Sequence, residues 1–198
     1  MTGTTSGPAA VQRANVQYPG GLSARYRWGG SGQAASVFEL SEAGGELQDH
    51  GPEAAAGGDP DRLCRAELRI EGPQGTWTAR FASTIFDEPQ GLLWDTAALL
   101  IVKYGFLVYG LDARRGDLRW THRAATPLLA VIGSSRLPHV LAQAEVETFA
   151  LGPDGETAWR ASHSDVVVEA ELIGGRLVLT SYGGERRAID PLTGRSLD

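Results

Sequence analysis

The residues of this chain with the widest range of catalytic and metal-binding roles are four histidines and a single cysteine. The histidines are His50, His122, His139 and His163, and no two of them have the spacing of zinc ligands. Cys64 has no second cysteine to pair with, so it can form neither an intramolecular disulfide nor a thiolate cluster. We therefore predict no metal site and no bound cofactor.

The segment SHSD, residues 162–165, contains the three residue types of a serine-hydrolase triad. A triad requires its members to converge in space, whereas adjacent Ser, His and Asp are common in turns. We interpret the segment as a loop between strands. An enzyme would need residues from separate repeats to meet, for example His139 and His163 with Asp165, and this is the alternative of a hydrolase or a lyase.

Other polar patterns have structural interpretations as well. The segment RWGGSGQ, residues 27–33, lacks the lysine and the spacing of a phosphate-binding P-loop. Carboxylates alternate along predicted strands, as they do on a solvated sheet face, at Glu145, Glu147, Glu169 and Glu171. Because no catalytic set emerges, we predict that the protein is not an enzyme.

Aromatic side chains and Lys103, the only lysine, gather within one predicted hairpin. Tryptophan and tyrosine are favoured anchors of protein interfaces. Our candidate partner-binding residues are therefore Trp94, Asp95, Lys103 and Tyr104. The alternative is that Trp94 belongs to the core and that Lys103 lies at a strand edge.

The composition is that of a globular protein, since 42% of the 198 residues are hydrophobic and 21% are charged. The formal net charge of −6 argues against binding to nucleic acid, because contacts to phosphates need a basic surface. Residues 1–21 contain no basic stretch followed by an apolar segment, so we interpret them as a disordered leader and not as a secretory signal. Residues 91–111 are apolar enough to suggest a membrane span, but Asp95 and Lys103 lie inside them. We predict buried strands there, no membrane partner and a cytoplasmic location.

A repeated turn is the clearest sign of the architecture. The segment VYGLDARRGDLRW, residues 108–120, returns in altered form at residues 148–159 and 186–198. The turn glycines are spaced 39 and 39 residues apart, at Gly116, Gly155 and Gly194. A period near 40 with short β-type runs and glycine-rich turns is typical of propeller blades.

Residues around each turn glycine are predicted to have structural roles. Asp112 and Asp190 would start the turn. Trp120 and Trp159 would lie on the outermost strand of a blade and pack against the neighbouring blade. Upstream, LLIVKYG at residues 99–105 aligns with LVLTSYG, tyrosine on tyrosine, at twice the spacing.

These segments resemble the quinoprotein-like, or PQQ-type, β-propeller repeats, in which a strand ending in A-L-D is followed by T-G and by a tryptophan. AIDPLTG fits that pattern closely, GLDARRGDLRW fits it well, and FALGPDGETAW fits it in part because its aspartate is missing. The resemblance covers about residues 89–198 and implies a propeller scaffold without a particular activity. Quinoprotein dehydrogenases that resemble these repeats bind a quinone beside calcium in a complete ring. This chain has too few blades and no recognisable dehydrogenase insertions, so we predict no quinone.

The first half of the chain is less regular. Within residues 22–88, the segments ARYRW, ASVFEL, RAELRIEG and GTWTARFAS are predicted strands of a degenerate first blade, and the acidic residues 41–61 are a predicted mobile loop. Three repeats follow in residues 89–198. The predicted fold is thus all-β, a propeller-like array of about four four-stranded antiparallel blades. Because an open blade exposes apolar side chains and strand edges, we expect a small ring or a half-ring completed by dimerisation.

The preferred function is a non-enzymatic protein-binding or scaffold module, whose partner is another protein or a second copy of the chain. A narrower hypothesis is an immunity-type or regulatory protein that neutralises a basic partner by charge complementarity. The alternatives are an enzyme with a site in the propeller channel and a structural subunit that associates with itself.

Overall fold

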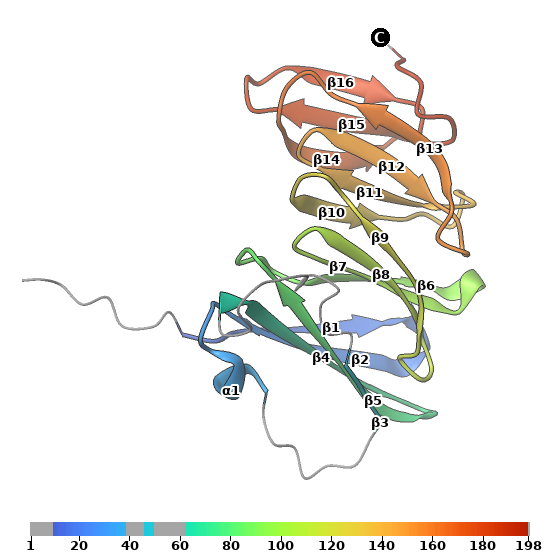
Figure 1. The fold of residues 1–198 in the computed structure, drawn as a ribbon. Coiled ribbons are helices and arrows are strands. Elements are labelled where there is room, and N and C mark those ends of the chain that lie inside the picture. Colours follow the sequence, from blue (N-terminus) through green and yellow to red (C-terminus); the bar gives the residue numbers. More distant parts are fainter. Residues whose placement is uncertain (1–9, 39–45, 50–61, 198) are drawn as a thin grey trace, which may run out of the picture. The chain divides into compact units, whose positions relative to one another are not determined.

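A computed structural model describes residues 10–38, 46–49 and 62–197. The chain divides into two compact units at Pro89, except that residues 114–116 group with the first unit. Both units are built from β-sheets (Figure 1). The candidate sites described below all lie in the second unit.

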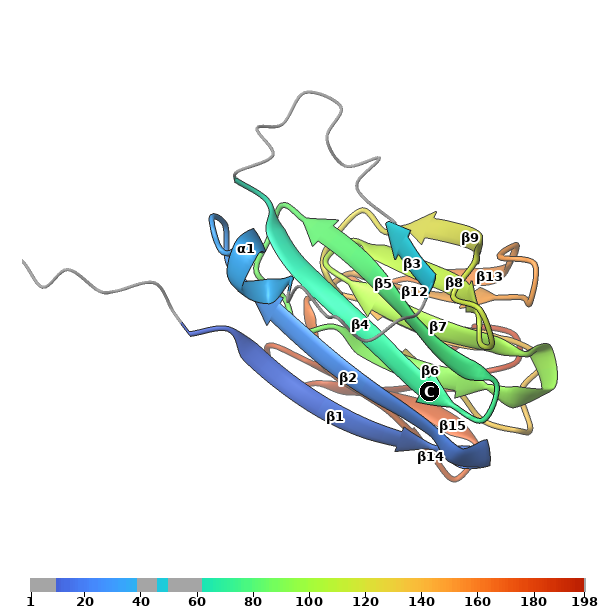
Figure 2. The same cartoon turned by 90° about the horizontal axis from the view of Figure 1, so that it is seen from below.

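The first unit contains one sheet, sheet A, in the strand order β1-β2-β4-β5-β3. Its strands are β1 (Gln12–Tyr18), β2 (Leu22–Gly29), β3 (Glu46–Asp49), β4 (Cys64–Gly72) and β5 (Gly75–Ser83). The strands β1, β2, β4 and β5 lie side by side and antiparallel (Figure 2), whereas β3 pairs parallel with β5. A 3-10 turn, η1 (Pro19–Gly21), joins β1 to β2, and one helical turn, α1 (Ala34–Val37), follows β2.

Alternation along the strands gives sheet A one apolar and one charged face. Tyr26, Leu68 and Ala79 pair with one another across β2, β4 and β5 and are buried. On the opposite face, the guanidinium of Arg80 donates to the carboxylate of Glu67 at 3.0 Å, so this acidic group, 8% exposed, has a charged partner.

Residues 12–18 form β1, which corrects the prediction of a disordered leader. Ala14, Val16 and Tyr18 alternate with polar residues along this strand, and the hydroxyl groups of Tyr18 and Tyr26 are 3.0 Å apart. This period of two is the pattern of a half-buried strand, and it supplies the strand that the first sheet needs. Residues 1–9 of the predicted leader lie outside the described residues.

Two further predictions for the first half are corrected. Residues 35–37 of the segment ASVFEL belong to α1 where a strand was expected, because alanine favours the helix and Val37 is fully buried there, and residues 39–40 of the segment lie outside the described residues. Within the predicted loop of residues 41–61, residues 46–49 form β3, and the remainder lies outside the described residues.

The second unit contains three sheets that follow one another along the chain (Figure 1). Sheet B consists of β6 (Gln90–Trp94), β7 (Leu99–Tyr104), β8 (Leu107–Asp112) and β9 (Leu118–Arg123). Sheet C consists of β10 (Leu128–Ile132), β11 (Val140–Ala144), β12 (Glu147–Leu151) and β13 (Thr157–Ser162). Sheet D consists of β14 (Val167–Ile173), β15 (Arg176–Ser181) and β16 (Arg186–Ile189). In each sheet the strands pair antiparallel in chain order, which confirms the predicted all-β fold built from propeller-like blades.

The apolar residues 91–111 form the end of β6, the short 3-10 helix η4 (Asp95–Ala97), β7 and most of β8. The prediction of consecutive strands in this window is therefore confirmed. No helix in the part of the chain that the structure describes has the length and apolar character needed to cross a membrane.

Hydrophobic clusters join the three sheets. Leu99, Ile101 and Val108 of sheet B pack with Phe149 and other residues of sheet C. On its other face, sheet C packs through residues such as Leu141 against a second cluster from sheet D. A β-bulge interrupts the pairing at the same place in β10 and in β14. Sheets C and D are therefore copies of one structural unit.

Strand pairing corrects the sequence alignment of Tyr104 with Tyr182. The partner of Leu177 in β16 is equivalent to the partner of Leu100 in β8, so Leu177 occupies the position of Leu100. The sequence alignment instead matches Leu177 with Leu99. Tyr104 is therefore a core residue of β7 that is 1% exposed, whereas Tyr182 follows β15 in a turn and is 82% exposed.

The face of sheet D that points away from sheet C carries polar residues beside the apolar Val178 and Ala188. Glu169 of β14 accepts a hydrogen bond from the hydroxyl of Thr180 at 3.3 Å, and Arg186 pairs with Thr180 on the same face. The equivalent face of sheet C is also mixed, with buried Leu141 and Ala150 at the positions of Val178 and Ala188, and buried Gln143 and Thr148 at those of Thr180 and Arg186. Dimerisation that covered this face of sheet D would therefore bury Glu169 and Arg186 together with apolar side chains.

Candidate functional site

The tryptophans and turn glycines of the repeat meet where consecutive sheets contact each other. Trp120 of sheet B donates from Nε1 to the carbonyl oxygen of Pro153 at 2.9 Å, and its ring covers Gly155. Gly155 has a φ of +83°, and a Cβ added to it would lie 2.6 Å from the indole. Trp159 of sheet C makes the same contact with Gly194. These positions therefore hold the sheets together.

The aspartates of the repeat organise its turns. Asp190 accepts a hydrogen bond from the backbone N–H of Leu192 at 2.9 Å, which is the geometry of a local turn. Asp112 pairs with the guanidinium of Arg119 at 2.6 Å at the start of the β8–β9 turn, in which Gly116 has a φ of +79°. Both aspartates act within their own repeat.

The four candidate partner-binding residues do not form one surface. Lys103 and Tyr104 lie in β7 and are only 5% and 1% exposed, and the ammonium of Lys103 donates to the carbonyl oxygen of Leu128 at 3.3 Å. Trp94 and Asp95 lie at the other end of the β6–β7 hairpin, at the start of η4. The prediction of a single patch is therefore wrong, because residues ten positions apart in a hairpin of this length reach opposite ends of it.

The contact between sheets C and D (the C–D junction) differs in chemistry from the contact between sheets B and C (the B–C junction). At the B–C junction, buried apolar side chains occupy the end next to the β9–β10 loop: Ala124, Leu128, Ala142, Ala144 and Phe149. At the C–D junction, strand pairing shows that the equivalent five positions are occupied, in the same order, by other residues: His163, Val167, Leu179, Ser181 and Arg187. Three of the five apolar positions have thus become polar.

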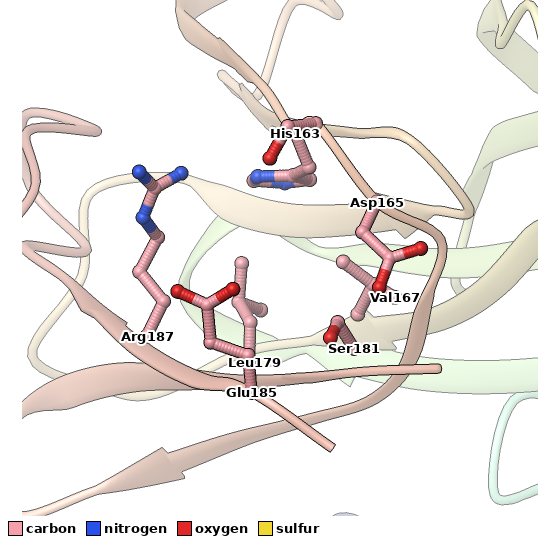
Figure 3. A pocket seen from close by; sticks show the side chains of 8 residues that line it. His163, Asp165, Val167, Leu179, Ser181, Glu185 and Arg187 are labelled. Atoms are coloured by element: carbon pink, nitrogen blue, oxygen red, sulfur yellow. The ribbon is translucent and has the colours of Figure 1, made fainter. Parts of the chain in front are cut away.

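The polar residues of the C–D junction line a pocket of about 50 Å³ (Figure 3). Figure 3 shows the imidazole of His163 facing the carboxylate of Glu185 across the pocket, with Arg187 on one side and Asp165 on the other. Ser181 lies below Asp165. The pocket therefore presents hydrogen-bond donors and acceptors and charges of both signs.

A chain of hydrogen bonds fixes the imidazole of His163. The side-chain amide of Gln143 donates to the carbonyl oxygens of Ala144 and Glu147 at 2.6 and 3.2 Å, so its oxygen is left as an acceptor. The hydroxyl of Thr148 donates to that oxygen at 2.5 Å. Since this hydroxyl has one proton, the 2.7 Å contact with Nε2 of His163 must be donated by the ring. In the neutral ring the free lone pair is then on Nδ1.

Two environments set the charges in the pocket. Burial lowers the pKa of His163 below 6.5, and the neighbouring guanidinium of Arg187 lowers this pKa further. Hydrogen bonds from the backbone N–H groups of Gly183 and Val166, at 3.2 and 2.8 Å, lower the pKa of Asp165. At neutral pH the pocket therefore contains a neutral imidazole beside ionised Asp165.

Exposed apolar side chains border the pocket. Tyr182 is 82% exposed, and Val166 and Val168 are 38% and 51% exposed. The backbone N–H of Tyr182 donates to the carbonyl oxygen of Val166 at 2.7 Å, so the two loops lie side by side. We define the junction surface as these three residues with His163, Asp165, Glu185 and Arg187.

The residues of the enzyme alternative do not come together. His163 and Asp165 line the C–D pocket, whereas His139 precedes β11 at the other end of sheet C and contacts the carbonyl oxygen of Pro191 at 2.7 Å. Among the residues that the structure describes, no group of three or more His, Cys, Asp or Glu side chains could hold a metal ion.

No protein-family model matches the chain, and no curated protein matches it. Solved structures do match. The chain is similar to BamB from Moraxella catarrhalis, with a TM-score of 0.54 and 14% identity over 97% of this chain and 66% of that one. It is also similar to the dihydro-heme d1 dehydrogenase NirN in complex with DHE, with a TM-score of 0.54 and 13% identity over 92% of this chain and 44% of that one. Both are β-propeller proteins.

The fold is of the β-propeller type. The chain spans just under two thirds of the matched BamB chain and less than half of the NirN chain. At these identities the likeness concerns the fold alone, and one of the two proteins is an enzyme. The function of this chain must therefore be argued from its own surface.

Sequence reasoning singled out two members of the junction surface, His163 and Asp165, and missed the other five: Val166, Val168, Tyr182, Glu185 and Arg187. The available signal was the repeat, because Arg187 stands where the preceding repeat has Phe149. This exchange of a core phenylalanine for a charged residue is visible only once the strand pairing gives the correct register.

Proposed function

We propose that the chain is a non-enzymatic protein-binding module built from PQQ-type propeller repeats, and that its junction surface binds a polypeptide segment of another protein. One observation supports this most. The C–D junction is polar and leaves a pocket beside the exposed Tyr182, at positions where the B–C junction is filled with apolar side chains.

The chemistry of the junction surface suits a polypeptide better than a simple ion. The carboxylates of Asp165 and Glu185 disfavour an anion, and the guanidinium of Arg187 disfavours a cation. A polypeptide segment offers N–H donors, carbonyl acceptors and side chains of either charge. Tyrosine and arginine are enriched among the residues that contribute most to protein interfaces, so Tyr182 and Arg187 are the expected anchors.

Another protein is a better candidate than a second copy of the chain. Two copies that completed a ring would bury the outer face of sheet D, where the charged Glu169 and Arg186 replace Ala130 and Thr148 of sheet C. The mixed charge of the junction surface likewise gives no support to the narrower hypothesis of an immunity-type protein that neutralises a basic partner.

Quantitative affinity purification from the native host tests the proposal. The tagged chain is compared with Tyr182→Ser, with Glu185→Lys and with the control Leu118→Ser, which removes an apolar side chain of β9 that is 44% exposed. We expect one protein to be retained equally by the wild-type and control chains and at least about tenfold less by the other two, a difference of about 1.4 kcal/mol. Equal retention of every co-purified protein by all four chains would contradict the proposal.

A further inference from the structure

A second and larger cavity, of about 280 Å³, lies at the B–C junction. It is lined by β6, by η4 and by the loop between β10 and β11: Leu92, Leu93, Trp94, Asp95, Thr96, Gly133, Ser134, Ser135, His139 and Val140. These elements connect the first strand of a sheet to the second. In an antiparallel sheet such connections lie at the opposite end from the turns that form the junction surface, so the two sites are separate.

Long connections create this cavity. Residues 133–139 separate β10 from β11, whereas two glycines, Gly174 and Gly175, separate β14 from β15. The long loop approaches β6 closely at Gly133, where an added Cβ would lie 2.7 Å from the side chain of Leu92. Sheet D has no comparable loop, so the C–D junction cannot form the same cavity.

Two polar residues of the cavity, His139 and Asp95, are suited to accept hydrogen bonds, beside the hydroxyls of Thr96, Ser134 and Ser135, which can donate or accept. The carbonyl oxygen of Pro191 can only accept, so the 2.7 Å contact with His139 is donated by Nε2 of the ring. The same oxygen accepts a hydrogen bond from Nε1 of Trp159 at 3.1 Å, which uses its second lone pair. In the neutral ring of His139, Nδ1 is then left as an acceptor, and Asp95 adds a carboxylate at the first residue of η4.

The charge of the cavity lining is negative. Asp95 is its one acidic residue, and none of the described residues that line the cavity is a lysine or an arginine. The apolar residues of the lining are Trp94, Leu92, Leu93 and Val140. An indole next to a carboxylate is a favourable environment for an organic cation.

We propose that this cavity binds a small organic cation, in which a primary ammonium or guanidinium group is attached to an aliphatic or aromatic body. The cationic group is bound by the carboxylate of Asp95 and by Nδ1 of His139, and the apolar body packs on Trp94. The volume suits a ligand at or below the lower end of the usual range for small-molecule sites, which begins at about 300 Å³. This site is independent of the protein-binding function proposed above.

Isothermal titration calorimetry with phenethylamine tests this site. The control ligand is 3-phenylpropionate, which has the same ring and a chain of similar length but carries a carboxylate. We expect saturable binding of the amine and at least about tenfold weaker binding of the acid. The variant Asp95→Asn should weaken amine binding by at least about tenfold, whereas Asp165→Asn at the junction surface should leave it unchanged.

Two outcomes would overturn the proposal: no saturable binding of phenethylamine at millimolar concentration, or equal binding by the wild-type chain and Asp95→Asn. Because Asp95 is exposed, the variant is expected to fold, and its circular dichroism spectrum and unfolding temperature should match those of the wild type. A chemical-shift change of the Trp94 indole N–H on amine addition, assigned by its absence in Trp94→Phe, locates the ligand.

Discussion

Sheets B and C meet through Phe149, which lies against the imidazole of His122 with ring centroids 4.5 Å apart, whereas sheets C and D meet through Arg187 at the equivalent position. Opposite Arg187, the position of His122 is taken by Ala161. The two junctions share their strand order, their β-bulge and their tryptophan-to-glycine contact. The fold therefore does not require a polar pocket at the C–D junction, and this is why we assign the pocket to binding.

The largest expected difference lies between Phe149→Ala and Arg187→Ala. Phe149 is 1% exposed, so its removal leaves a cavity and should lower the free energy of unfolding by about 3–5 kcal/mol. Arg187→Ala removes a side chain from a pocket that is already open, and its cost should stay below about 1 kcal/mol. Urea unfolding of both variants measures this. Equal losses would show that the two junctions contribute equally to stability.

The tryptophan-to-glycine contact should be equally important at both junctions. Gly155→Ala and Gly194→Ala each place a Cβ within 2.6 Å of an indole at positive φ, so each should cost about 2 kcal/mol or more. The control is Gly174→Ala, where φ is +58° and nothing lies within 4 Å of the added Cβ. It should cost only the backbone strain of about 1 kcal/mol. If Gly194→Ala behaved like this control, the contact at the C–D junction would be unimportant.

Each junction contains a histidine whose pKa is lowered mainly by burial, His122 at the B–C junction and His163 at the C–D junction. Because the pKa of His163 in the folded chain is below 6.5, the unfolded chain binds more protons than the folded chain in mildly acidic solution. The stability that the neutral imidazole contributes is therefore complete above pH 6.5 and decreases as the pH falls below it. His163→Gln keeps a donor to Thr148 and removes the titration.

The pH dependence of the unfolding free energy between pH 7.5 and 5.5 should therefore be weaker in His163→Gln, by at most about 1.4 kcal/mol per pH unit, the value for one proton. His122→Gln should have an effect of the same sign. An unchanged slope in both variants would mean that neither imidazole is neutral in the folded chain.

Much of the fold could be predicted from the sequence, because the turn glycines recur at a fixed spacing and the strands between them alternate. The Asp-to-Gly turns and Trp120 and Trp159 were placed by that repeat alone. The strand β1 was missed although Ala14, Val16 and Tyr18 alternate with polar residues, since its position before the first obvious strand suggested a leader.

The candidate sites were harder to predict than the fold. A single extra residue in the β15–β16 turn shifts the register, so the tyrosine alignment concealed that Tyr182 is exposed and Tyr104 buried. The cavity at the B–C junction depends on the contact of two loops that are about 40 residues apart in the sequence, so no local sequence pattern predicts it. Local sequence reasoning therefore predicts the blades better than the junctions between them.

The most direct test of the account replaces the polar residues of the C–D junction with their B–C counterparts, by combining His163→Ala, Ser181→Ala and Arg187→Phe with Ala161→His, and measures the unfolding temperature. If the polar residues serve binding, the filled junction should unfold at the wild-type temperature or above it. A decrease of more than about 5 °C, which corresponds to roughly 1.3–2.5 kcal/mol in a chain of this size, would contradict the account. The polar residues would then stabilise the fold, and the proposal that the junction surface is a binding site would be wrong.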